Sequence, residues 1–203
     1  MRVSIRIAIL LALLHVPALA VSADLQKGLT AFDEGDYATS LAECQPLADA
    51  GNAGAQFCIG RLYANGFGVA MDDALAIKWY SLAADAGHAE AQFNLGVMYA
   101  NGWGVDMNWE EAARYYLLAA DQGFVPAQKA LAYAIGHGMG VTKDRVQAFA
   151  WYDIAAQLSD DLGAGLKRDE LTEKMSADEI ASGQQIVAKW LGDFKSAAEK
   201  AGN

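Results

Sequence analysis

The chain has 203 residues, with 15 Lys and Arg against 25 Asp and Glu and a formal net charge of −10. Such an acidic surface repels nucleic acid and anionic lipid, because binding to either depends largely on neutralising phosphates with Lys and Arg. The chain contains only three prolines, and its abundance of alanine favours helices.

The first twenty residues have the order of a secretion signal. Arg2 and Arg6 precede an apolar run over residues 7–14, and small residues follow at two cleavage positions, after Ala20 or after Ala23. The run is too short to span a bilayer permanently. We therefore expect residues 1–20 to be removed, no integral membrane segment to remain, and the mature chain to be exported. The periplasm is the expected destination, with secretion beyond the cell as the alternative.

The two cysteines, Cys44 and Cys58, both lie in the part of the chain that we expect to be exported. An oxidising compartment permits a disulfide between them, which would close a short loop. A pair of unlinked buried thiols is the other interpretation. The sequence leaves both open.

A repeat of 36 residues dominates the rest of the chain. The step relates sets of glutamines, glycines and tyrosines, namely Gln56, Gln92 and Gln128, Gly66, Gly102 and Gly138, Gly68, Gly104 and Gly140, and Tyr80, Tyr116 and Tyr152. Apolar residues at helical spacing on both sides of the glycines predict a helix, a turn and a second helix in each repeat. The predicted second helices begin after good N-cap residues, which are Asp72, Asn108 and Asp144.

The period divides the chain into units. We place repeats at residues 53–88, 89–124 and 125–159, and a degenerate, tetratricopeptide-like unit at residues 24–52. Residues 160–203 are expected to form capping helices, the last of which opens with Ser176 and Glu179 as a capping box. Its apolar residues Ile186, Val187 and Trp190 suit a cap over the final repeat. Such a cap is needed because a solenoid must close the ends of its core.

The glycine pairs raise the question of a phosphate-binding loop. Such a loop follows a strand and usually carries Lys-Ser or Lys-Thr after the glycines, whereas here a helix precedes and Val69, Val105 and Val141 follow. Three copies in a fixed register indicate turns whose backbone conformation a side chain would forbid. No nucleotide or other cofactor is therefore expected.

The stretch AQFNLGVMYANGWGVDMNWEEAARYYLLAADQG, residues 91–123, resembles the Sel-1-like repeat family, a relative of the tetratricopeptide repeats. The resemblance implies an all-α, right-handed superhelical α/α solenoid of about four helix-turn-helix repeats that binds a protein or peptide. Its concave surface would be lined by the first helix of each repeat. The family's concave positions correspond to Phe57, Arg61, Phe93, Val97, Lys129 and Tyr133 in this chain.

Positions that vary between repeats carry further information about binding. The residue between the two glycines is Phe67, Trp103 or Met139, and Trp109 opens the second helix of repeat 2. Such side chains form a partner-binding ridge in one interpretation, since aromatic residues and Met contribute strongly to interfaces. In the other interpretation they fold back over neighbouring helices.

Catalytic and metal-binding patterns are weak. His88 and His137 stand on different turns, and neither has His, Cys or acidic neighbours at metal-ligand spacing. We therefore predict no catalytic residue and no metal, and an exported scaffold that mediates protein interactions in the cell envelope. Two alternatives stay open. Some cysteine-rich secreted members of the family are linked to β-lactam binding or hydrolysis, and a secreted protein of this kind can also bind a host protein.

Overall fold

The computed structural model describes residues 23–159 and 162–201, and the predicted secretion signal lies outside these residues. All regular elements in the described ranges are helices, which confirms the predicted all-helical class. They are α1 (Leu25–Glu34), α2 (Tyr37–Asp49), α3 (Ala53–Asn65), α4 (Asp73–Asp85), α5 (Ala89–Asn101), α6 (Trp109–Asp121), α7 (Val125–His137), α8 (Arg145–Leu158), α9 (Leu162–Thr172) and α10 (Ala177–Ala201).

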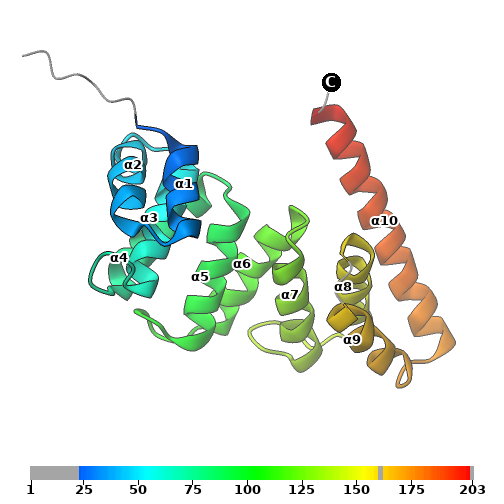
Figure 1. Ribbon diagram of the computed structural model, residues 1–203. Coiled ribbons are helices and arrows are strands. Elements are labelled where there is room, and N and C mark those ends of the chain that lie inside the picture. The colour runs from blue at the N-terminus through cyan, green and yellow to red at the C-terminus, as the bar shows by residue number, and fades with distance from the viewer. Residues whose placement is uncertain (1–22, 160–161, 202–203) are drawn as a thin grey trace, which may run out of the picture.

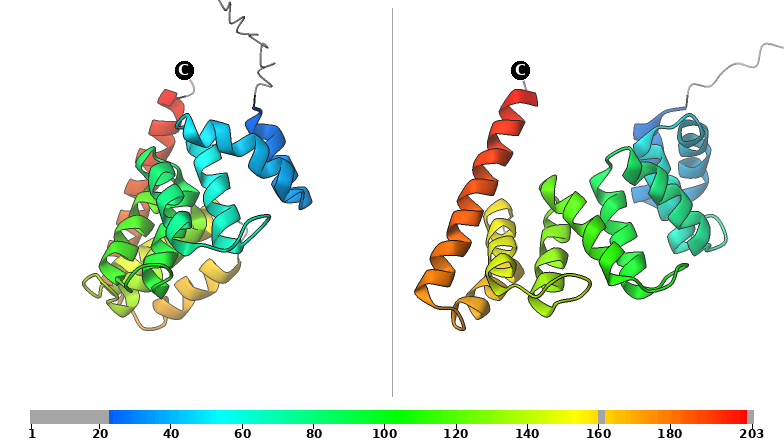
Figure 2. Two further views of the ribbon diagram at one scale, coloured as in Figure 1. Left: turned by 90° about the vertical axis from the view of Figure 1, so that its left-hand side faces the viewer. Right: turned by 180° about the vertical axis from the view of Figure 1, so that it is seen from behind.

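The helices form antiparallel pairs that stack in chain order (Figure 1). Helix α1 packs on α2, α3 on α4, α5 on α6 and α7 on α8, and the second helix of each pair contacts the first helix of the next. Because each pair contacts mainly its neighbours, the fold is a solenoid. Figure 2 shows α10 as a long helix that extends past the rest of the stack, and it packs against α8.

The glycine turns hold successive pairs together. Both glycines of each turn have positive φ, for example 70° at both Gly102 and Gly104. The second glycine also faces the first residue of the preceding pair's second helix, so that a Cβ on Gly68 would lie 2.8 Å from Cβ of Tyr37 and one on Gly104 would lie 2.6 Å from Cβ of Asp73. These contacts explain the repeated glycines without any bound phosphate.

The predicted N-caps are confirmed at α4, α6 and α8. The side chains of Asp72, Asn108 and Asp144 each accept a hydrogen bond from a backbone N–H in the first turn. At the start of α10 the capping box is complete, since the Ser176 N–H donates to Glu179 Oε2 at 2.8 Å and the Glu179 N–H donates to Ser176 Oγ at 3.2 Å. These bonds satisfy N–H groups that a helix start leaves without intrahelical partners.

Three buried glutamines link each repeat to the preceding pair. Gln56, Gln92 and Gln128 donate through Nε2 to the carbonyl oxygens of Ala48, Ala84 and Ala120, at 3.3, 3.1 and 3.1 Å. Each bond joins the first helix of a repeat to the end of the preceding helix. The same glutamine therefore recurs in each repeat for a structural reason. It bonds a carbonyl group at a helix end, where carbonyl groups lack intrahelical partners.

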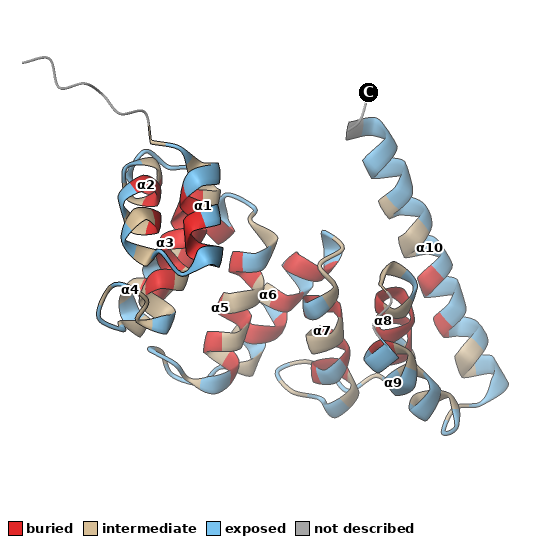
Figure 3. Cartoon of the chain, in the orientation of Figure 1, coloured by how far each residue is buried: buried red, intermediate tan, exposed pale blue. Residues whose placement is uncertain are grey.

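Helix α10 covers the end of the stack, but over a narrow face. Val187 packs against Ile154, and the rings of Trp151 and Trp190 lie edge to face with centroids 5.9 Å apart. Ile186 is 40% exposed, so its predicted place in the cap is wrong. The reason is helical geometry, because residue 186 lies about 100° around the helix from residue 187. Figure 3 shows this as a mostly exposed helix with buried residues on one side.

Candidate functional site

A pocket of about 220 Å³ lies between α3 and α5, the first helices of repeats 1 and 2. We call it the α3–α5 groove. Its lining mixes a cation, an acid, amides and apolar groups, contributed by Arg61, Ala64, Asn65, Asp73, Tyr80, Asn94, Val97, Met98 and Trp103. Three of the predicted residues therefore meet here, namely Arg61, Val97 and Trp103.

Arg61 is the cation of this groove. Its guanidinium carbon lies 3.7 Å from the centroid of the Phe32 ring, a cation–π contact that fixes the side chain in place. It forms no salt bridge with any residue in the described ranges. The guanidinium is thus held at the wall of the groove with hydrogen-bond donors available to a ligand carboxylate or carbonyl.

Two asparagines and a tyrosine supply the polar groups beside it. Asn65 Nδ2 donates to the Arg61 carbonyl oxygen at 2.8 Å, which leaves its amide oxygen as an acceptor. Asn94 and Tyr80 line the groove together, and burial raises the pKa of Tyr80 to about 12. Tyr80 is therefore neutral at physiological pH. An arrangement of amides, an arginine and apolar side chains suits a peptide backbone and its side chains better than it suits catalysis.

The two predicted phenylalanines belong mainly to the core. Phe57 is only 7% exposed, with its ring stacked on His88 at 4.5 Å between centroids. Phe93 is half-buried, with ring centroids 5.8 Å from Tyr116 and 5.4 Å from Phe124. The prediction that Phe57 lines the binding surface is corrected by its burial, and the candidate surface is smaller than the sequence suggests.

The remaining concave residues lie on α7. Lys129 is half-buried, and Tyr133 is 45% exposed, with its ring tilted against His137 at 4.2 Å between centroids. Tyr133 lines a second pocket of about 220 Å³, which α9 completes with Lys167 and Glu170. Of the predicted concave residues, Arg61 and Val97 line the α3–α5 groove, Tyr133 lines this second pocket, and the other three line neither, so the six do not form one continuous site.

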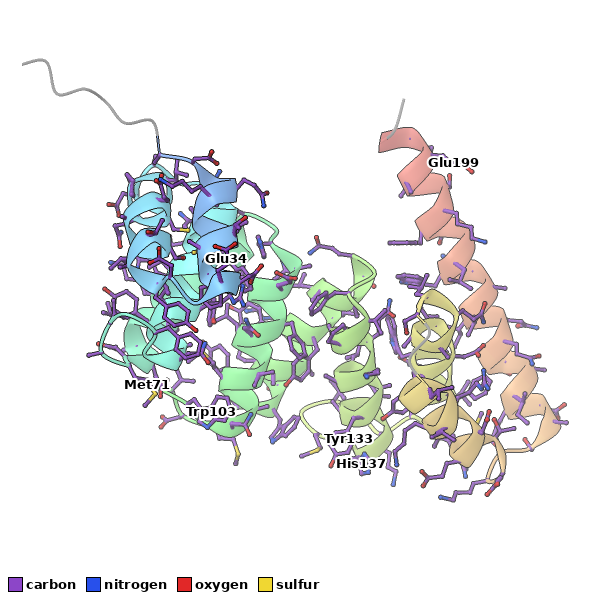
Figure 4. All side chains as sticks on the ribbon, in the orientation of Figure 1. Glu34, Met71, Trp103, Tyr133, His137 and Glu199 are labelled. Atoms are coloured by element: carbon purple, nitrogen blue, oxygen red, sulfur yellow. The ribbon has the colours of Figure 1, made fainter. Side chains whose placement is uncertain are left out.

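The turn residues divide between the two interpretations. Phe67 folds back, because its ring stacks on Tyr37 at 4.5 Å between centroids with an interplanar angle of 13°. Trp103 is 52% exposed and lies at the edge of the molecule (Figure 4). Trp109 is half-buried at the start of α6 and faces Gly140 of the next turn. Of these three residues, Trp103 is the one whose exposure favours contact with a partner.

Cys44 on α2 and Cys58 on α3 are both free, fully buried thiols, so the bridge that the sequence left open is not formed here. The two thiols interact directly, and Ser40 Oγ lies 3.3 Å from Cys58 Sγ. The hydrogen bond with Cys44 lowers the pKa of Cys58, while burial acts in the opposite direction. The pair sits in the core between the first helix pair and repeat 1, and neither thiol lines the α3–α5 groove.

The sequence reasoning missed Asn94 and Asp73 as groove residues. Asn94 stands where the other repeats carry Cys58 and Ala130. A comparison of the repeats at this position therefore shows an amide side chain in repeat 2 alone, which could have indicated a binding residue. Asp73 lines the groove from the start of α4. Asp73 reaches the groove because the glycine turn of repeat 2 packs against the start of α4. The spacing of the repeats does not predict this contact.

No group of three or more His, Cys, Asp or Glu in residues 23–159 and 162–201 is arranged to hold a metal ion. Within the same residues, no helix combines the length and hydrophobicity needed to cross a membrane.

Comparisons with known proteins agree with this architecture. The Sel1 repeat family matches residues 53–88, 89–124 and 125–160. A crystal structure of a Sel1 repeat protein from Oxalobacter formigenes is similar at 34% sequence identity and a TM-score of 0.65, over 68% of this chain and 56% of that protein. No curated protein matches.

A second solved structure is a protective antigen present in uropathogenic Escherichia coli strains, which displays an SLR fold. It is similar at 25% identity and a TM-score of 0.52, over 85% of this chain and 47% of that protein. The chain thus spans about half the length of the two solved proteins. With three matched repeats and the stacked helix pairs, this chain belongs to the Sel1 repeat family.

Proposed function

We propose that this chain is an exported scaffold that holds a protein partner in the α3–α5 groove and performs no chemistry of its own. Proteins of the Sel1 repeat family are generally scaffolds for protein–protein interaction. The observation that carries the proposal is the held but unpaired guanidinium of Arg61 beside amide and apolar groups in one pocket. Such a pocket binds an extended segment or a helix end through its carbonyl or carboxylate groups.

The proposed location is the periplasm. Its support is the order of Arg2 and Arg6, the apolar run and the small residues before the first described helix. Cell fractionation of the native host tests this part, with release of the protein by osmotic shock as the expected result. Retention in the cytoplasm of a chain with an intact N-terminus would contradict it.

Affinity capture with a surface variant tests the groove. We compare the native sequence with an Arg61→Ala, Asn94→Ala, Val97→Ala variant, because these side chains line the groove without forming the buried core. Truncating Phe57 would instead open a cavity. The matched control is Leu82→Ala with Leu118→Ala, at equivalent exposed positions of α4 and α6.

We expect the groove variant to lose about tenfold or more of a captured envelope protein and the control variant to keep it. Circular dichroism and thermal unfolding establish that both variants are folded. Undiminished capture by the groove variant would place the binding site elsewhere on the solenoid.

A further inference from the structure

Three large apolar side chains are exposed along one edge of repeats 1 and 2. Met71 is 68% exposed, Trp103 52% and Met107 65%. Met71 and Met107 occupy the same position in successive repeats, at the end of each glycine turn. We call these three residues the turn strip. Figure 4 shows Met71 and Trp103 at the lower edge of the molecule.

The two turns that carry the turn strip are neighbours in the structure. A Cβ on Gly102 would lie 3.4 Å from Cβ of Met107, and Trp103 follows Gly102 directly. Gly104 on the other side of Trp103 packs against Asp73, two residues after Met71. The turn of repeat 2 therefore lies against the end of the turn of repeat 1.

Exposure of these side chains is specific to the first two repeats. Phe67, which precedes Met71 in its own turn, is folded back onto Tyr37 and stays half-buried. In repeat 3 the position of Met71 and Met107 is held by Lys143. Exposed apolar side chains grouped in this way mark an interaction surface, and methionine adapts to varied partner surfaces.

The charges near the turn strip indicate the chemical class of the partner that it binds. Residues 66–73 and 102–110 contain Asp72, Asp73, Asp106 and Glu110 but no Lys or Arg. One cation from outside these segments, Arg61, shares the α3–α5 groove with Asp73 and Trp103, so the acids are in excess. Of these carboxylates, Asp72 is used as the N-cap of α4. An anionic membrane surface is disfavoured by the remaining acids, whereas a segment that carries both apolar and basic side chains is complementary.

We propose that the turn strip binds a cationic amphipathic segment of another protein. Its apolar side chains cover Met71, Trp103 and Met107, and its Lys or Arg side chains face Asp73, Asp106 and Glu110. This surface adjoins the groove proposed above, because Trp103 and Asp73 also line that pocket, whereas Met71 and Met107 do not.

Methionine methyl NMR of the full chain provides the test. The probe is a short amphipathic peptide of leucine and lysine, and its matched control carries glutamate in place of each lysine. Binding of the lysine peptide should shift the methyl signals of Met71 and Met107 and leave that of Met98, which is buried, unchanged. The affinity should fall as salt is raised, because the contact depends on exposed charges.

A Met71→Ser, Met107→Ser variant should bind the lysine peptide about tenfold more weakly. The matched control variant is Leu117→Ser with Leu118→Ser, which removes exposed leucines from α6 and should bind as the native chain does. The groove variant Arg61→Ala, Asn94→Ala, Val97→Ala keeps Met71, Trp103 and Met107 and should bind the lysine peptide at least as well as the native chain, because loss of Arg61 removes a positive charge from the pocket that contains Asp73. Loss of the envelope protein without loss of the lysine peptide therefore separates the two proposals.

Three results would overturn this proposal. One is equal binding of the glutamate peptide, and another is binding that the Met71→Ser, Met107→Ser variant retains. The third is a shift of the two methyl signals on concentrating the protein alone, with sedimentation showing a dimer, which would make the occupant a second copy of this chain.

Discussion

One buried polar atom in repeat 1 lacks a hydrogen-bond partner, and the neighbouring repeat shows how to supply it. In repeat 2, Gln122 Nε2 donates to Gln92 Oε1 at 2.7 Å, so both ends of the buried Gln92 amide are satisfied. In repeat 1, Ala86 stands at the position of Gln122, and Gln56 Oε1 is buried without a partner among the described residues. We therefore expect Ala86→Gln to stabilise the protein.

The magnitude follows from two opposing effects. A net hydrogen bond contributes about 1 kcal/mol, and a buried unsatisfied oxygen costs about 1 to 3 kcal/mol. Fixing a glutamine side chain that was free costs about 1 kcal/mol or more in conformational entropy. At the middle of the range of about 1 to 3 kcal/mol, less the entropy cost, Ala86→Gln should thus raise the free energy of unfolding by about 1 kcal/mol, and Gln122→Ala should lower it by about 1 kcal/mol.

Urea unfolding followed by circular dichroism measures both changes. The control is Ala86→Leu, which adds a side chain of similar size without an amide and should not reproduce the gain. If the Ala86→Gln variant has no higher free energy of unfolding than the Ala86→Leu variant, and the Gln122→Ala variant is as stable as the native chain, the pairing of these amides contributes nothing to stability. The reasoning about Gln56 would then be refuted.

Two further substitutions test the packing and the caps. Gly96→Ala should destabilise the protein by about 1 to 3 kcal/mol, because its Cβ would lie 2.5 Å from the Tyr116 ring. Gly192→Ala, in open space on α10, should be neutral or stabilising by thermal unfolding, and an equal loss at both sites would contradict the packing argument. His88 caps α5 by accepting a hydrogen bond through Nδ1, and burial lowers the pKa of its imidazole. The neutral side chain therefore stabilises the fold above the unfolded-state pKa of about 6.5. This contribution is lost as the pH falls through the lower pKa of the folded state. His88→Asn should therefore show a smaller loss of stability on acidification in urea unfolding at about pH 7.5 and pH 5, and an unchanged pH dependence would rule out His88 as its source.

The repeat architecture was predictable because each recurring residue has a recurring contact. Gly96 faces Tyr116 as Gly60 faces Tyr80, and the glycine turns approach the preceding helix pair in every repeat. The packing contacts therefore repeat every 36 residues, so the sequence period predicts them. The predicted cap was less precise, since which side of α10 meets α8 depends on a helix crossing that has no counterpart in the repeats.

The candidate site was only partly predictable, because exposure depends on residues that are distant in sequence. Phe67 and Trp103 occupy the same turn position, yet Phe67 stacks on Tyr37 whereas the corresponding neighbour of Trp103 is Asp73. A stacking partner thirty residues earlier thus decides whether the turn residue is covered. Phe57 is likewise buried because His88, the N-cap residue of α5, stacks on it.

Photo-crosslinking from position 97 tests the central claim most directly. A benzoylphenylalanine placed at Val97 in the α3–α5 groove should crosslink a specific protein in the native cell envelope. The same probe at Leu118, exposed on α6, should not crosslink that protein. A protein captured from position 118 and absent from position 97 would contradict the assignment of the groove as the binding site.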